Sequence, residues 1–244
     1  MAGFRPGWVP TLAMLGAVAL LVSLGTWQVR RHHWRQEVLA QANARIDAPP
    51  LAFRQALVEA PEDRQFRRVR VEGRYDKARS ILVQNVPREG RSGARVLTPL
   101  LVEGEAGPEA VLVDRGWVPW ARAGAFLDED AERPEEGTAE VTGLLFELAL
   151  EGARPAGGGT PRREWVRFDP RRHAAPLQEQ LPYRLAPFLV QRSDDGSGAL
   201  PLGGIQRPTS PVSHVSYAIT WYSMAAIAVG VWIGLGRQRA RESR

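Results

Sequence analysis

The amino-acid sequence predicts a membrane protein of the α+β class, in which two transmembrane helices flank a mainly antiparallel, barrel-like β domain outside the cytoplasm. Two uncharged apolar runs, one near each end of the 244-residue chain, predict the helices. Short runs rich in Val, Leu and Ile lie between them, separated by Gly, Pro and Glu clusters that are typical of a small barrel or curled sheet. The expected order is a cytoplasmic N-terminus (1–8), a first span (9–29), a periplasmic domain (30–213), a second span (214–235) and a basic cytoplasmic tail (236–244).

The first apolar run covers residues 8–28 and contains no charged residue. Its length is close to the ~20 residues that a helix needs to cross ~30 Å of hydrocarbon. Trp8 and Trp27 lie near its two ends, where indole rings favour the headgroup region. A cleaved signal peptide is the alternative, but the run is long for such a segment and ends in TWQVRRHHW instead of small residues. We therefore expect a retained anchor.

The second apolar run, residues 215–235, is followed by a tail with four arginines, Arg237, Arg239, Arg241 and Arg244. Positive charge beside a span favours the cytoplasmic side. Three arginines after the first span, Arg30, Arg31 and Arg35, favour the opposite orientation. Long translocated loops are less sensitive to their charges than short ones. We therefore expect both tails in the cytoplasm and the large domain outside it.

Residues 68–76 alternate between apolar and polar side chains and predict a strand. Five further runs rich in Val, Leu and Ile predict strands at 80–87, 94–102, 109–119, 139–148 and 187–192. Helical segments are expected at 35–44, 53–59 and 169–180. Residues 153–164, rich in Gly and Pro, are expected to form a flexible loop. The acidic residues 128–136 lack the spacing of a calcium loop and predict a solvated turn, and His173 is expected to be a solvated histidine at a helix start.

Composition and motifs argue against several classes of protein. The net charge of +5 comes almost entirely from arginines scattered among acidic residues, and no nucleic-acid-binding signature accompanies it, so nucleic acid is not an expected partner. The chain has no cysteine, which removes disulfides, thiolate metal sites and thiol redox chemistry. No hydrolase, zinc-protease, P-loop or dinucleotide motif is present, so no catalytic residue is expected.

Three of the four histidines, His32, His33 and His214, lie at the same predicted membrane face. On a helix, His214, Tyr217 and Trp221 share one side. A histidine flanked by aromatic and small residues between helices can bind haem iron through one ring nitrogen, with the porphyrin against the aromatic rings. A histidine that merely lies among the lipid headgroups is the alternative, and the residues alone leave both interpretations open.

Gly230 and Gly234 form a G-x-x-x-G pair in the second span. Such a pair lets another helix approach closely. Either the first span or a foreign subunit is a suitable partner for this face.

Five segments occur in one order along the chain: LGTWQVRRHHW, FRRVRVEGRYD, GARVLTPLLV, VDRGWVP and HVSYAITWY. Together with the two-span frame, they resemble the Surfeit-locus (Surf/Shy1-type) family of cytochrome c oxidase assembly factors over nearly the whole chain. The resemblance implies a chaperone, not an enzyme, that assists the delivery or insertion of haem A into the catalytic subunit of haem-copper cytochrome c oxidase. A haem-free scaffold that stabilises oxidase subunits during assembly is the alternative.

The resemblance also implies cofactor, partners and location. Haem A is the expected transient cofactor, the oxidase catalytic subunit is the expected partner, and haem A synthase and membrane lipid are further candidates. The expected location is the bacterial plasma (inner) membrane, crossed twice, with a periplasmic domain. His214 matches the histidine that opens the second span in this family and is the expected iron ligand, with Tyr217 and Trp221 covering the ring.

Further residues match the family's motifs. Trp27, Gln28 and Arg31 match the pattern LGxWQxxR, with a role in folding or in function. A second set, expected to be structural or partner-facing, comprises Arg115, Gly116 and Trp117 of the RGWVP segment. Two expectations go beyond the resemblance: His32 or His33 is a candidate second iron ligand, and interfacial arginines are candidate partners of haem propionates, namely Arg30, Arg31 and Arg207.

Overall fold

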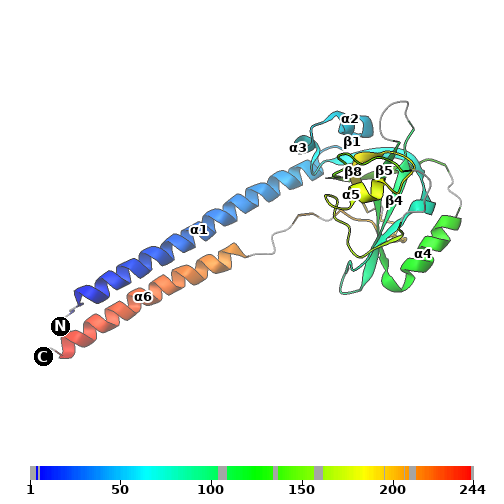
Figure 1. The fold of residues 1–244 in the computed structure, drawn as a ribbon. Helices are drawn as coiled ribbons and strands as arrows, with labels where there is room; N and C mark the ends of the chain where they lie inside the picture. The colour runs from blue at the N-terminus through cyan, green and yellow to red at the C-terminus, as the bar shows by residue number, and fades with distance from the viewer. Residues whose placement is uncertain are drawn as a thin grey trace. The chain divides into compact units, whose positions relative to one another are not determined.

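The computed structural model describes residues 4, 6–103, 109–133, 137–156, 162–194, 196–205, 207–208 and 213–242. The chain divides into two compact units (Figure 1). One unit is helical and consists of Met1–Gln41 and Pro208–Arg244, and the other is the β domain, Ala42–Arg207. The α+β class expected from the sequence is confirmed, with an apolar helix on either side of the β domain along the chain.

The helical unit contains most of α1 (Trp8–Asp47) and all of α6 (His214–Glu242). Both helices are long and apolar enough to cross a membrane. Only 6% and 11% of their most apolar windows are buried, which distinguishes them from core helices of a globular domain. The helix expected at 35–44 is not a separate element but part of α1, because no Gly or Pro interrupts the chain between Gly25 and Pro49.

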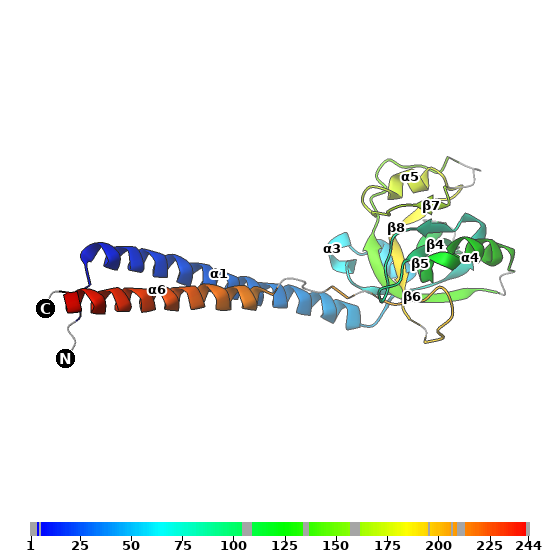
Figure 2. The ribbon, with the colours of Figure 1, turned by 90° about the horizontal axis from the view of Figure 1, so that it is seen from below.

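Helices α1 and α6 run antiparallel and side by side (Figures 1 and 2). Near the start of α1, the Trp232 indole N–H donates to the Thr11 hydroxyl at 3.0 Å. Further along, Gly25 lies against the Tyr222 ring, where a Cβ atom on the glycine would come within 2.8 Å of the ring. Small residues at these crossings allow the two backbones to approach closely.

The β domain is built on one sheet. Its strands, within the described residues, are β1 (Leu51–Ala52), β2 (Arg68–Tyr75), β3 (Ile81–Val83), β4 (Gly93–Leu101), β5 (Ala110–Pro119), β6 (Ala139–Glu147), β7 (Glu164–Trp165) and β8 (Leu185–Arg192). The order is β1-β2-β6-β8-β5-β4-β3-β7, and an additional β2–β4 pairing closes β2, β6, β8, β5 and β4 into a ring. The barrel and all six strands expected from the sequence are confirmed. Three of the strand pairs are parallel, namely β1–β2, β3–β7 and β5–β8.

The shorter helices of the domain are α2 (Phe53–Val58), α3 (Pro61–Arg64), η1 (Lys77–Arg79), α4 (Trp120–Glu132) and α5 (Ala174–Gln178). The helix expected at 53–59 is confirmed, whereas the one expected at 169–180 is reduced to the short α5. The solvated turn expected at 128–136 is wrong for its described part, because Asp128–Glu132 belong to α4. Residues 134–136, and 157–161 of the loop expected at 153–164, lie outside the described residues.

Alternation along the strands separates the two larger of three apolar clusters in the described part of the β domain. The barrel interior is filled by side chains including Val71, Leu100, Val113, Leu145 and Phe188. The opposite face of the sheet is covered by β7 and α5 (Figure 2), and the cluster there includes Ile81, Leu97, Leu112, Trp165 and Leu177. The second cluster gives the sheet a buried outer face, on which charged side chains also lie.

A β-bulge interrupts the pairing of β4 with β5. Val96 lies opposite Gly116 while Leu97 lies opposite Asp114, so Arg115 is the extra residue in β5. The Arg115 side chain forms a buried ion pair with Asp130 of α4. Arg115 therefore attaches α4 to the sheet.

Gly116 and Trp117 attach the segment that contains Leu202 to the sheet. Backbone hydrogen bonds join Trp117 and Leu202 in both directions, at 2.9 and 2.8 Å, and the Trp117 indole donates to the Val86 carbonyl at 2.7 Å. Gly116 has a φ of +130°, and a Cβ there would lie 2.3 Å from the Leu202 carbonyl oxygen. The RGW residues thus build the domain itself.

We expect Gly116→Ala to lower the free energy of unfolding by about 2–4 kcal/mol, because the new methyl meets both a strained φ and the Leu202 carbonyl. Gly124→Ala in α4 is the matched control, since a Cβ there has no neighbour within 4 Å. This control should raise stability by about 0.5–1 kcal/mol through helix propensity. Chemical denaturation of the full chain in detergent checks both, and equal stability of the two variants contradicts the role given to Gly116.

Candidate functional site

The candidate site centres on His214, the first residue of α6. Its ring is half-buried, and Nδ1 lies 2.9 Å from the Gln28 side-chain oxygen of α1. An amide oxygen can only accept a hydrogen bond, so this contact requires the proton on Nδ1. In the neutral ring, the lone pair of the other nitrogen, Nε2, is then available to a metal.

The segment before Gln28 sets its position. Gly25 packs against the Tyr222 ring, and the Thr26 hydroxyl lies 3.1 Å from the Tyr222 hydroxyl. These two contacts fix the register of α1 against α6, and Gln28, about one turn further along α1, then meets His214. Within the LGxWQxxR pattern, Gly25 and Thr26 therefore have a packing role.

Tyr222 was not among the residues expected from the sequence. The interpretation from the sequence followed the spacing i, i+3, i+7 from His214 to Tyr217 and Trp221. In the structure, the residues that face α1 follow the neighbouring diagonal, from Ala218 (4% exposed) to Tyr222. The i, i+4, i+8 spacing from His214 is the sequence signal that identifies Tyr222.

Tyr217 and Trp221 flank this contact face. Tyr217 is 54% exposed, and Trp221 is half-buried. Among the described residues, no ring contact joins either side chain to His214. Tyr217 is thus accessible beside the histidine, whereas Trp221 is partly covered.

The structure does not bring the other membrane-face histidines to His214. His32 and His33 follow Gln28 by about one turn, or ~6 Å along the axis of α1. Their own rings lie 5.9 Å apart. Within the described part of the chain, no cluster of three or more His, Asp or Glu side chains forms a metal cage.

The arginines expected near the site have different surroundings. Arg31 stacks its guanidinium over the Trp34 ring at 4.1 Å, and Arg30 is exposed. In the β domain, Arg207 lies 2.6 Å from an Asp47 carboxylate oxygen, and this hydrogen bond lowers the pKa of Asp47 below its ordinary value. Arg207 therefore already has a carboxylate partner.

Trp27, Gly230 and Gly234 face outward from the helix pair. Trp27 is 57% exposed, and both glycines are exposed, with no neighbour within 4 Å of the position that a Cβ would take. Since α1 packs on the other side of α6, the G-x-x-x-G pair does not serve the α1–α6 contact. Its face is free for another helix or for lipid.

His173, in the β domain, is not the solvated histidine expected from the sequence. Its ring is half-buried 5.5 Å from the Trp165 ring, and its Nδ1 accepts the Asp169 backbone N–H at 2.8 Å. The histidine closes the turn before α5. This is a structural role, which the apolar neighbours Trp165 and Phe168 indicate in the sequence.

The residues at His214 fit a haem group. One ring nitrogen is held by Gln28, which leaves one nitrogen for iron, as is usual for metal-binding histidines. Exposed aromatic and apolar side chains surround it, including Tyr217 and Val215. Such a surface would accommodate a flat apolar macrocycle, with His214 as the residue that would hold its iron.

Comparison with known proteins gives consistent results. The sequence model of the SURF1 family matches residues 15–226. A SURF1-like protein of Monosiga brevicollis is 28% identical over 247 residues, which cover 95% of this chain and 89% of the relative. Surfeit locus protein 1 of Xenopus tropicalis is 26% identical over 86% of this chain and 70% of its own length, and that of Homo sapiens is 25% identical over 86% and 71%.

We expect the neutral His214 ring to carry its proton on Nδ1, because the Gln28 amide presents its oxygen to that nitrogen. Gln28→Leu removes that acceptor and should redistribute the proton toward Nε2, whereas Gln28→Glu keeps an acceptor and should preserve the tautomer. Side-chain ¹⁵N NMR of histidine-labelled protein, at a pH where the ring is neutral, distinguishes the tautomers. An Nε2-protonated ring in the parent chain contradicts the assignment.

Proposed function

Because this chain belongs to the SURF1 family, we propose that it assists the delivery or insertion of haem A into the catalytic subunit of haem-copper cytochrome c oxidase. Membership in the family implies a role in cytochrome c oxidase assembly. The finer proposal is that the protein holds haem A transiently during this assembly, with His214 as the axial ligand.

One observation carries the proposal: the Gln28 contact leaves Nε2 of His214 available at the rim of the helix pair. Haem A would supply an iron that binds a histidine nitrogen of this kind. Tyr217 and Trp221 lie on the same side of α6 at the helix end, and we assign them the role of covering the ring. Gln28 orients the histidine and is a positioning residue.

The neutral partner of His214 suits a carrier. A carboxylate that accepts from a ligating histidine raises the basicity of the ring and strengthens its bond to a metal. Gln28 accepts through an uncharged amide, which increases the basicity less. A single histidine held in this way would form a weaker bond to the haem iron. Such a bond would break more readily when the haem passes to the acceptor subunit.

The proposed location is the bacterial plasma membrane, with both tails in the cytoplasm and the β domain in the periplasm. Three arginines follow the apolar part of α6 within that helix, namely Arg237, Arg239 and Arg241. Positive charge of this kind is retained on the cytoplasmic side. The polar end of the helix pair, with His214 and Gln28, then lies at the periplasmic face.

A haem-free scaffold is the second candidate function. The observation that favours it is the exposed Gly230–Gly234 face, which the α1–α6 contact leaves open. A helix of an oxidase subunit could pack there without any cofactor. The two candidates differ in which substitutions abolish assembly.

We expect the full chain, purified in mild detergent from cells that make haem A, to show a haem A spectrum that His214→Ala abolishes. Gln28→Leu should weaken haem binding by about 10–100-fold, because the ring loses its orienting partner. His33→Ala, at an exposed neighbouring histidine, is the matched control and should retain the spectrum. Equal haem in the parent and His214→Ala proteins would overturn the choice of ligand.

The variant His214→Ala and two glycine variants of α6 separate carrier from scaffold when oxidase assembly is measured in cells. A scaffold loses oxidase assembly with Gly230→Leu or Gly234→Leu and keeps it with His214→Ala. A haem carrier loses oxidase assembly with His214→Ala. A parent protein without haem, despite a supply of haem A, would favour the scaffold.

The proposed orientation is tested with single cysteines, since the chain contains none of its own. Ala125→Cys, on the exposed side of α4, should react with a membrane-impermeant maleimide in intact bacterial cells. Gln238→Cys, exposed near the end of α6, should react only after lysis. The reverse pattern of labelling would place the domain in the cytoplasm.

A further inference from the structure

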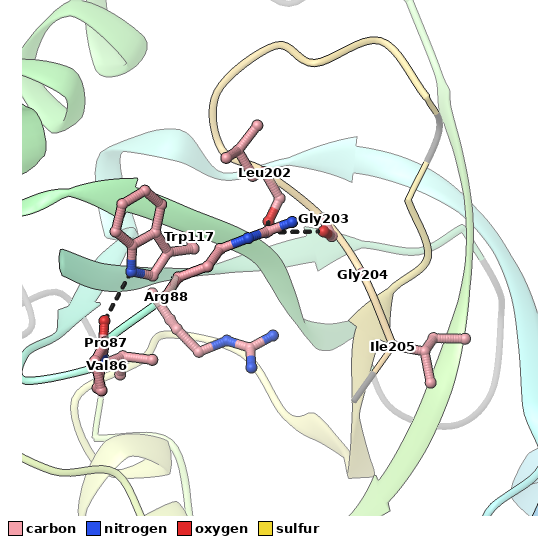
Figure 3. A pocket seen from close by; sticks show the side chains of 9 residues that line it. Val86, Pro87, Arg88, Trp117, Leu202, Gly203, Gly204 and Ile205 are labelled. Carbon is pink, nitrogen blue, oxygen red and sulfur yellow. Dashed lines mark hydrogen bonds between the residues drawn. The ribbon is translucent and has the colours of Figure 1, made fainter. Parts of the chain in front are cut away.

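Two cavities of the β domain meet at Arg95, on the outer face of β4 and β5. The first has a volume of about 200 Å³ and lies between Arg88, Trp117 and Ile205 (Figure 3). The second has a volume of about 290 Å³ and is lined mainly by apolar side chains, among them Phe146, Phe168 and Leu189. Arg95 lines both cavities.

The Arg95 guanidinium is only partly satisfied. Its Nε lies 2.6 Å from the Asp114 carboxylate and forms an ion pair with it. The two side chains are only 15% and 10% exposed. Within the described ranges of the chain, no hydrogen bond joins the terminal nitrogens of Arg95 to another residue. Terminal guanidinium N–H groups form a planar fork that matches a carboxylate.

The surroundings of Arg95 favour an anion on one side and an apolar group on the other. In the first cavity, Arg88 adds a second guanidinium, whose Nη1 donates to the carbonyls of Leu202 and Gly203 at 3.2 and 3.3 Å (Figure 3). The described lining of this cavity contains no acidic side chain. In the second cavity, Asp114 is engaged by Arg95 and by the Gly116 backbone N–H at 3.2 Å.

We propose that the joined cavities bind a small amphipathic carboxylate. Its carboxylate accepts hydrogen bonds from the terminal nitrogens of Arg95, near Arg88, and its apolar body lies between Phe146 and Phe168. Ligand pockets commonly measure about 300–1,000 Å³, so a second cavity of about 290 Å³ admits only a small molecule. This site belongs to the β domain and does not depend on haem binding at His214.

The test is a ligand-observed NMR titration of the full chain in detergent with 3-phenylpropionate. The matched neutral probe is 3-phenylpropionamide, which has nearly the same shape and partitions into the micelle without a charge. We expect saturable binding of the carboxylate, at least about tenfold tighter than binding of the amide, because a charge-assisted pair with arginine is lost in the amide.

The variant that tests the location is Arg95→Gln combined with Asp114→Asn. Changing both residues avoids a buried charge without its partner. This variant should bind 3-phenylpropionate at least about tenfold more weakly. Arg70→Gln is the matched control, because Arg70 is an exposed arginine of β2 paired with Glu140, and it should bind as the parent does. Thermal unfolding of each variant verifies that the domain is folded.

Three outcomes overturn the proposal: no saturation of the parent chain up to about 10 mM probe, equal affinity for the acid and the amide, or unchanged affinity in the folded double variant. If the double variant does not fold, the comparison of acid with amide on the parent chain still decides whether the site recognises a carboxylate. None of these results bears on the haem spectrum of His214.

Discussion

The close approach of Gly25 to the Tyr222 ring sets the register in which the two long helices pack. A side chain at residue 25 would separate the helices at this point, and the hydroxyl contact between Thr26 and Tyr222 would be lost with it. Because the helices are rigid over a few turns, the same register places Gln28 opposite His214. The candidate haem ligand thus owes its orientation to a packing contact about one turn away on α1.

The β domain has a comparable constraint in the bulge of β5. The extra residue, Arg115, turns toward α4, and Gly116 then faces the segment that contains Leu202. The same shift sets Arg95 near Asp114 on the outer face of the sheet. The β-bulge in β5 therefore attaches both α4 and the segment that contains Leu202 to the sheet. It also places the Arg95–Asp114 ion pair where the two cavities meet.

The sequence was sufficient for the long strands and the two apolar helices, since their periodicity and length extend over many residues. It was insufficient for α4, because the helix follows β5 without a break at Trp120 and buries Asp130, which is stabilised by Arg115 through tertiary packing. The two-residue strands β1 and β7 are too short for any period. His214 and Gln28 were each identified, but their contact joins residues 186 positions apart, which no local pattern reveals.

The chemistry of the Gln28–His214 contact determines its response to ionic strength. An amide and a neutral imidazole carry no net charge, so dissolved ions have little effect on their hydrogen bond. The Arg207–Asp47 pair of the β domain is a contrast, since both side chains are about half exposed and their attraction is screened as salt increases. The orientation of the neutral histidine ring is consequently insensitive to the surrounding salt concentration.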